Sequence, residues 1–271
     1  RLFAVVLFVA ACSSPPAPDT TEGSQATSNP YEARYHDSER AIMALQTLSS
    51  DTYEGRKTGE PGNLKAQDWI ESQLRDLGAS PVYPDGYRAP FTVEAFSQAK
   101  DDISGTNLFA AIEGSGGVDA PVIVVSAHYD HLGIKDDDIY NGADDNASGV
   151  AALIEVIDWF KANPPENNVV FAFFDAEEDG ITGSAHFVAN LPDPMRDRLA
   201  LNLNLDMVAR ADKGELYAVG TYHFPELTDM VETVASKTPL TLKRGHDSPE
   251  WGEQDWSLQS DHAPFLRAGY R

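Results

Sequence analysis

The chain has 271 residues, and 42% of them are hydrophobic, which is enough for one large α/β domain with a well-formed core. It carries 20 basic and 43 acidic side chains, which give a formal net charge of −23. This charge argues against a nucleic-acid-binding protein, because such proteins present a basic face to the phosphates.

The N-terminal residues indicate an export signal. Residues 2–11 (LFAVVLFVAA) form an apolar run that is too short to span a membrane but has the length of a signal-peptide core. The run ends in the residues VAAC, which resemble the bacterial lipobox, in which the cysteine is lipidated. We therefore expect a lipoprotein signal peptide over residues 1–12, with Cys12 as the lipidated residue; an incidental buried cysteine is the alternative. Cys12 is the only cysteine of the chain, so no intrachain disulfide can form.

Residues 13–30 (SSPPAPDTTEGSQATSNP) are rich in Pro, Ser and Thr and contain too few apolar residues to fold, which predicts a disordered tether. The sequence thus predicts an exported bacterial lipoprotein of the cell envelope, held at the membrane by Cys12. Ser13 after the cysteine suits the outer membrane in an organism with two membranes. The chain starts at Arg1 rather than Met and stops straight after an apolar segment, and we expect both ends to be truncated.

From Tyr31 onward, amphipathic helices alternate with apolar strands. We expect helices at residues 38–49, 63–77, 147–162 and 227–237, and strands at residues 107–113, 121–127, 168–174, 199–205 and 215–220. In the third helix, Val150, Leu153, Ile154 and Ile157 recur at the spacing of one buried helix face. This alternation favours a single α/β domain over residues 31–271, with a mainly parallel sheet covered on both faces. Residues 83–100 are expected to be irregular.

Polar residues follow three of the predicted strands. The first runs into the sequence HYDH at 128–131, the second into DAEED at 175–179, and the third into Asp206. The loop NGADDNASGV at 141–150 follows the first strand, and Asp261 and His262 precede a further apolar segment. Ligands bind at the carboxyl ends of the strands in open α/β sheets, so these groups should meet at one rim.

Such a rim would combine histidines with several carboxylates, a donor set that suits zinc or a similar divalent ion. Each group taken alone is better explained as ordinary solvated loop residues. Five ligands are too many for one tetrahedral zinc, whereas two metals that share a bridging carboxylate would use all five. Competing motifs are missing, because the sequence contains no GxSxG, HExxH, GxxxxGK or GxGxxG.

The motifs SAHYDHLG, NGADDNASGV, FFDAEEDGITGS, NLNLDMV and SDHAPF, in this order, resemble those of the zinc-dependent M28 peptidases. The segment LSSDTYEGRKTGEPGNLKAQDWI also resembles the N-terminal part of that family, so the resemblance runs from about residue 38 to the end. It implies a mixed, largely parallel sheet with helices on both faces, as in zinc aminopeptidases of the phosphorylase/hydrolase-like fold. It also implies a further strand and helix after SDHAPF, and hence a domain truncated at its C-terminus.

The resemblance implies two Zn²⁺ ions per chain, with Mn²⁺ or Co²⁺ as possible substitutes. In the implied ligand set, His128 and Asp206 bind one metal, Glu178 and His262 bind the other, and Asp145 bridges the two. Asp145 is chosen over its neighbour because it precedes the Asn-x-Ser-Gly sequence, as the bridging residue of the family does.

The resemblance also assigns the residues around the metals. Glu177 matches the general base of the family. Asp130 matches the carboxylate that orients the imidazole of His128, and such outer partners commonly fix ligand histidines. His131 is taken as non-ligating, and Asp144 as a polar loop residue.

The implied activity is metal-assisted hydrolysis of peptides, most commonly the release of N-terminal residues by an aminopeptidase. A carboxypeptidase or dipeptidase would share these motifs. Two further alternatives are a glutaminyl cyclase, which resembles the family but uses one zinc, and a non-catalytic metal-binding module. Residues 244–256 (RGHDSPEWGEQDW) are hypothesised to line the substrate pocket, although a solvated loop would have the same composition.

Overall fold

A computed structural model of the chain describes residues 38–93, 102–210 and 213–271. The predicted signal peptide with Cys12 and the predicted tether lie outside the described residues. Within the described part, no helix has both the length and the apolar composition needed to cross a membrane.

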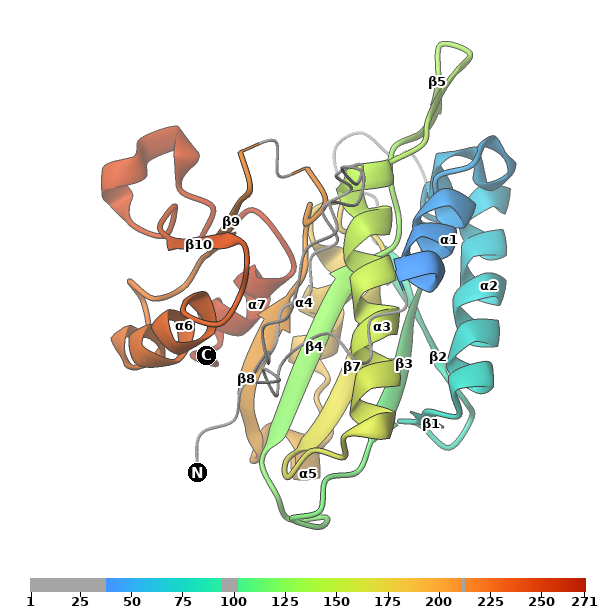
Figure 1. Cartoon of the computed structure of the whole chain (residues 1–271). Helices are drawn as coiled ribbons and strands as arrows, with labels where there is room; N and C mark the ends of the chain where they lie inside the picture. The colour runs from blue at the N-terminus through green and yellow to red at the C-terminus, as the bar shows by residue number, and fades with distance from the viewer. Residues whose placement is uncertain (1–37, 94–101, 211–212) are drawn as a thin grey trace, which may run out of the picture.

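The centre of the molecule is a mixed sheet with the strand order β1-β3-β7-β4-β8, in which β2 also pairs with β3 (Figure 1). Its strands are β1 (Ser80–Pro81), β2 (Arg88–Val93), β3 (Ile103–Ile112), β4 (Val122–His128), β7 (Asn168–Phe174) and β8 (Leu199–Asn204). β4 lies between β7 and β8 and runs parallel to both, whereas β3 is antiparallel to β7, β1 and β2. All strands except β3 therefore point the same way, and their carboxyl ends lie at one rim.

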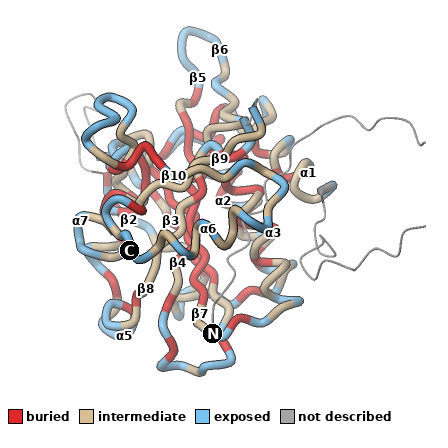
Figure 2. Tube along the Cα trace, turned by 60° about the vertical axis from the view of Figure 1, so that its left-hand side comes forward, coloured by how far each residue is buried: buried red, intermediate tan, exposed pale blue. Residues whose placement is uncertain are grey.

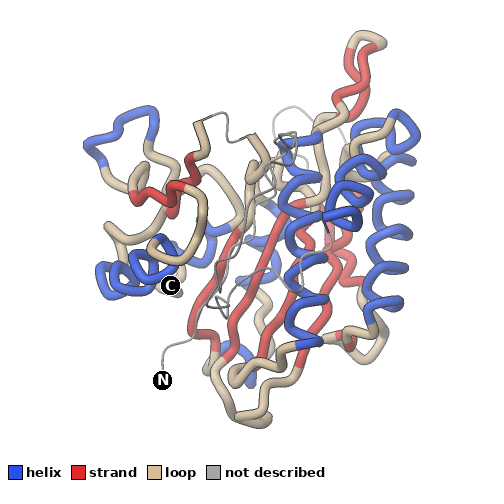
Figure 3. Tube along the Cα trace, in the orientation of Figure 1, coloured by secondary structure: helices blue, strands red, loops and turns tan. Residues whose placement is uncertain are grey.

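Alternate residues of the strands enter two hydrophobic cores, one on each face of the sheet. Leu108, Val125 and Phe171 belong to the first core, and their chain neighbours on the same strands belong to the second. The first core is covered by α1 (Ser38–Leu48), α2 (Pro61–Leu77) and α3 (Gly149–Ala162), which lie side by side in Figure 3. The second is covered by α4 (Thr182–Ala189), α5 (Asp193–Arg196) and α7 (His262–Arg267). Because both faces are covered, the central strands β4 and β7 are almost entirely buried, whereas β1 at the edge is exposed and β8 is mostly half-buried (Figure 2).

The remaining strands form two separate two-stranded sheets, one at the rim and one beside β8 (Figure 1). β5 (Gly133–Lys135) and β6 (Asp138–Tyr140) form a hairpin that projects beyond the rim (Figure 1). β9 (Glu215–Ala218) pairs in parallel with β10 (Thr241–Arg244), next to α6 (Thr228–Ala235). Four short helical turns complete the described chain: η1 (Asp51–Arg56), η2 (Ala143–Ser148), η3 (Pro225–Leu227) and η4 (Pro249–Gln254).

The α/β fold predicted from the sequence is confirmed, with most element boundaries within a few residues. The main error is at residues 83–100, where an irregular segment was predicted and the structure contains β2. Pro90 lies within β2 and lacks a backbone N–H, which makes the segment a poor strand by composition. β2 tolerates the proline because β3 is its only partner among the described strands.

Candidate metal centre

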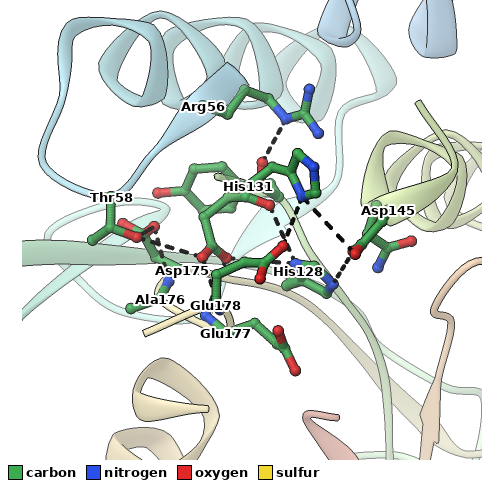
Figure 4. A network of polar contacts seen from close by, with 12 residues as sticks. Arg56, Thr58, His128, His131, Asp145, Asp175, Ala176, Glu177 and Glu178 are labelled. Carbon is green, nitrogen blue, oxygen red and sulfur yellow. Dashed lines mark hydrogen bonds and ion pairs between the residues drawn. The ribbon is translucent and has the colours of Figure 1, made fainter. Parts of the chain in front are cut away.

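The predicted polar residues meet at the rim formed by the carboxyl ends of β4, β7 and β8 (Figure 4). His128 is the last residue of β4, and Asp206 follows β8 by two residues. Asp145 lies in η2, immediately before α3, while Glu177 and Glu178 follow β7. Parallel pairing of β4 with both neighbours brings these three chain segments together, as the sequence analysis expected.

A first group of donor atoms consists of His128, Asp145 and Asp206. His128 Nε2 lies 3.2 Å from Asp145 Oδ1 and 3.5 Å from Asp206 Oδ1. The Nε2 atom and Asp206 Oδ1 are buried and have no hydrogen-bond partner among the described residues. Buried polar atoms are normally satisfied, so this convergence of unpaired donors fits a bound divalent cation.

The electrostatics of this group favour a positive charge. Burial by itself lowers the pKa of His128, but the close carboxylates of Asp130, Asp145 and Asp206 outweigh burial and raise the pKa well above 6.5. Burial raises the pKa of Asp206, but the close imidazole of His128 outweighs this and leaves the pKa below its usual value. The carboxylates around His128 therefore favour a positive charge at this point, which a divalent cation would also supply.

A second group consists of His131, Asp145 and Glu178. His131 Nδ1 lies 2.7 Å from Glu178 Oε1 and 3.9 Å from Asp145 Oδ2. The two oxygens of Asp145 therefore face different histidines, which is the arrangement required of a shared carboxylate.

The histidine in this second group is His131, whereas the resemblance implies His262 as the histidine of the second metal. His262, at the start of α7, belongs to neither group, and its Nε2 lies 3.0 Å from the carbonyl oxygen of Trp256. The sequence analysis set His131 aside, although its position three residues after His128, directly past the strand end, could have indicated a second donor at the same rim.

Asp130 connects the end of β4 to the segment after β7. Its carboxylate accepts the backbone N–H groups of Glu177 at 3.1 Å and Glu178 at 3.2 Å, and one oxygen lies 3.5 Å from His128 Nδ1. Asp130 is fully buried. The position beside Nδ1 agrees with the orienting role that the resemblance implies.

Glu177 and Glu178 are neighbours in sequence, but their side chains point in different directions (Figure 4). Glu178 faces His131, whereas Glu177 lies away from that group. Burial raises the pKa of Glu177 to about 9; His128 opposes this shift, while the nearby charges of Asp261 and Asp130 add to it. Glu177 is thus a carboxyl group that readily holds a proton beside the candidate metal ligands, a property that suits a proton-transfer group.

The η2 loop that carries Asp145 is attached to the segment after β8. The side-chain oxygen of Asn146 accepts the N–H groups of Gly149 and Met207, and its amide donates to the carbonyl of Leu205 at 2.9 Å. Asp144 accepts the N–H groups of Ala209 and Arg210. Asp144 is therefore structural within this loop, consistent with its assignment as a non-ligand.

Arg56, at the end of η1, lies under the same rim and is completely buried. Its guanidinium donates to four backbone carbonyls, including that of Tyr129 (Figure 4). Burial lowers the pKa of Arg56 to about 10, against the opposing influence of Asp130, Asp145 and Glu178. The group therefore stays charged at neutral pH. The sequence analysis did not identify this residue.

Residues 244–256, hypothesised to line the pocket, form a stack of aromatic rings. The ring of His246 lies between the indoles of Trp251 and Trp256, with centroid distances of 4.0 and 3.7 Å. Asp255 accepts the hydroxyl and N–H of Ser257, so its carboxylate is engaged within the loop. The segment contacts the rim through the Trp256 carbonyl, which lies beside His262.

A largely parallel α/β sheet with histidines and carboxylates gathered at its strand ends defines a candidate metallohydrolase. The chain belongs to peptidase family M28, whose family model matches residues 107–271.

Among curated proteins, the chain is similar to the alkaline phosphatase isozyme conversion protein of Escherichia coli (27% identity over 205 residues, covering 72% of this chain and 57% of that protein). It is also similar to aminopeptidase YwaD of Bacillus subtilis (33% identity over 155 residues, 55% of this chain and 30% of that protein). The chain thus spans only about a third to just over half of these relatives.

Among solved structures, the fold is similar to that of a zinc aminopeptidase from Bacillus subtilis (TM-score 0.63, 19% identity, 86% of this chain and 83% of that one). It is also similar to that of a glutaminyl cyclase from an Acidobacteriales bacterium (TM-score 0.68, 22% identity, 92% of this chain and 81% of that one). At these identities the structures support the fold and leave the choice between the two activities to the site.

Proposed function

We propose that the protein is a co-catalytic di-zinc exopeptidase that removes N-terminal residues from peptides. The observation that carries the proposal is the position of Asp145, whose two oxygens face two separate groups of donors. Membership of the M28 family and the similarity to named aminopeptidases support the peptidase class.

His128, Asp145 and Asp206 would hold one metal, and Asp145 and Glu178 would supply the carboxylates for the other. For the histidine of the second site, the resemblance proposes His262, while the proximity to Glu178 favours His131. When bound, the metals supply Lewis acidity that polarises the scissile carbonyl and makes a water acidic.

The residues of the chain have separate tasks in this reaction. A carboxylate oxygen of Glu177 takes the proton from the attacking water and passes it to the nitrogen of the leaving amine. The raised pKa of Glu177 would fall once cations occupy the neighbouring site, because positive charge favours the ionised form. Asp130 keeps His128 in the orientation that leaves Nε2 directed at Asp145 and Asp206.

The specificity is tested by incubating the protein with peptides that carry free or blocked ends and identifying the products by mass spectrometry. An aminopeptidase gives a ladder that shortens from free N-termini and leaves N-terminally blocked peptides intact. A ladder from the C-terminus would keep the hydrolytic reaction and overturn the proposed specificity.

A glutaminyl cyclase is the second candidate, favoured by the fold similarity to such an enzyme. Two observables separate the candidates. The cyclase would release ammonia from peptides with N-terminal Gln, and it would bind one zinc instead of two. Binding of two zinc ions without any turnover would instead indicate a metal-binding module.

We also propose that the protein is an exported lipoprotein, held at the membrane through Cys12. The support is the order of an apolar run, the VAAC sequence and the Pro/Ser/Thr-rich segment that follows it. In membrane and soluble fractions of cells that express the protein, Cys12→Ser should move it from the membrane fraction to the soluble fraction.

A further inference from the structure

The backbone around Arg56 follows an unusual path into the interior. Glu54, Gly55 and Arg56 all have positive φ angles, of 51°, 67° and 53°. A Cβ atom on Gly55 would lie 2.5 Å from the carbonyl oxygen of Tyr140 and 2.6 Å from that of Gly133, so only glycine fits there. Non-glycine residues rarely adopt this conformation and persist in it only where the surrounding structure holds them. This turn places the Arg56 side chain in the interior, next to the carbonyls of Tyr129 and Gly142.

In the part of the chain that the structure describes, the guanidinium of Arg56 donates only to backbone carbonyls. Nε donates to the carbonyl of Tyr129 at 2.7 Å, and Nη1 donates to those of Leu48 at 2.6 Å and Asn141 at 2.7 Å. Nη2 donates to the carbonyl of Gly142 at 2.9 Å. Among the described residues no carboxylate forms an ion pair with this buried guanidinium. A buried arginine usually pairs with an acidic side chain. The guanidinium of Arg56 instead connects backbone segments through their carbonyl groups.

Three of the four carbonyls that Arg56 binds belong to segments that carry proposed metal ligands, and the fourth is that of Leu48 at the end of α1. Tyr129 lies directly after His128, and Asn141 and Gly142 begin the loop that carries Asp145. One planar group with donors in a fixed fork thus joins the end of β4 to the start of η2. The main-chain carbonyl of Arg56 also accepts the N–H of His131 at 3.4 Å.

We propose that Arg56 is a positioning residue that sets the separation of His128 and Asp145, and thereby the geometry of the first metal site. This inference rests on the proposed function, because it concerns the ligands of that site. The geometry supports it, since the His128–Asp145 approach of 3.2 Å lies between the two segments that the guanidinium connects.

The positive charge of Arg56 and the hydrogen bonds of its guanidinium have opposite expected effects on cation binding. A buried positive charge near Asp145 and Glu178 repels a cation, so its removal alone would tighten zinc binding. Loss of the guanidinium hydrogen bonds would let the Asp145 loop move relative to β4 and would weaken zinc binding. The sign of the change in affinity therefore distinguishes positioning from a purely electrostatic influence.

The test compares wild type with two variants. Arg56→Met removes both the positive charge and the hydrogen-bond donors, whereas Arg56→Lys keeps the charge but lacks the planar set of guanidinium donors. Arg88→Met is the matched control, because Arg88 is paired with Asp68 and Glu71, away from the rim. Zinc affinity is measured by competition with a chromophoric chelator, and backbone protection of metal-free protein is measured by hydrogen exchange with mass spectrometry.

We expect Arg56→Met to weaken zinc binding at least tenfold and to speed exchange in residues 141–149 selectively, while Arg88→Met changes neither. Arg56→Lys should recover only part of the affinity, and it stands in for the methionine variant if that protein does not fold. Unchanged or tighter zinc binding with unchanged exchange at 141–149 would overturn the proposal. If wild type bound no zinc, the proposed function would fail, and the exchange measurement would still decide the role of Arg56.

Discussion

Glu177 and Glu178 differ more in environment than their adjacent positions suggest. Glu178 lies against His131, whereas Glu177 points away and has a pKa raised to about 9 by burial. We predict that Glu177→Gln retains bound zinc but loses about 10²–10⁴ of the turnover rate, because the amide cannot accept the proton. Glu178→Gln is the control and should lose zinc. Zinc content by atomic spectroscopy and peptide turnover are measured on both variants, and full activity in Glu177→Gln would refute the assignment.

Single-residue contacts also bear on whether His131 or His262 is the histidine ligand of the proposed second metal. His131 Nδ1 lies beside Glu178, whereas His262 Nε2 is occupied by the Trp256 carbonyl. We therefore expect His131→Ala to weaken the second zinc more than His262→Ala does. Stepwise zinc titration of each variant measures this, and the reverse order would restore the assignment that the resemblance implies.

At the scale of elements, the Asn146 side chain connects the η2 loop to the residues after β8 through hydrogen bonds. Two of its three hydrogen bonds are buried and the third is partly buried, and a buried partner left unsatisfied costs about 1–3 kcal/mol. We predict that Asn146→Ala lowers the free energy of unfolding by at least about 2 kcal/mol and weakens zinc binding, because Asp145 is next to it. Urea denaturation checks the first effect, with Asn190→Ala as control, since Asn190 makes an exposed contact within its own helix end. Equal stability of the two variants would contradict the prediction.

Prediction from sequence succeeded for the elements whose pattern is local. β4 and β7 are continuous apolar runs, and α3 has a regular buried stripe, so their type and ends are encoded in the adjacent residues. The polar groups that follow those strands were expected at one rim for the same reason, and the rim brings His128, Asp145 and Asp206 together.

What the sequence could not indicate depends on contacts between distant segments. Arg56 lies in a polar stretch with no periodicity, and its partners are up to 86 residues away. The stack of His246 between two tryptophans likewise depends on a loop conformation that composition does not specify. β2 forms because β3 offers it a free edge, in spite of its proline.

At the scale of the whole molecule, several buried groups at the rim retain protons in the fold. Burial raises the pKa values of Asp175 and Asp261 to about 7 and that of Glu177 to about 9, and carboxylate partners raise that of His128. Above about pH 6.5 the unfolded chain has released the carboxyl protons and is losing the proton of His128, whose ordinary pKa is about 6.5. The folded state therefore binds more protons than the unfolded chain and loses stability as pH rises to 8.5. Burial lowers the pKa of His262, which has the opposite effect, but only below about pH 6.5.

We therefore predict that metal-free protein loses on the order of 1–3 kcal/mol of stability from pH 6.5 to 8.5. Urea midpoints after dialysis against a chelator measure this loss. Added zinc should flatten the dependence, because bound cations favour the ionised carboxylates. A metal-free protein that became more stable over this range would refute the prediction.

The position of β4 in the sheet has a consequence for the order of folding. Both neighbours of β4 come later in the chain, and β8 pairs with it only after about 70 further residues. The rim that gathers the proposed ligands is thus complete only when the last of these pairings has formed. A cation that binds this finished rim should slow the unfolding of the native protein and leave its rate of refolding nearly unchanged. Zinc would then stabilise the sheet only after its strands have paired, and it would take no part in the nucleation of folding.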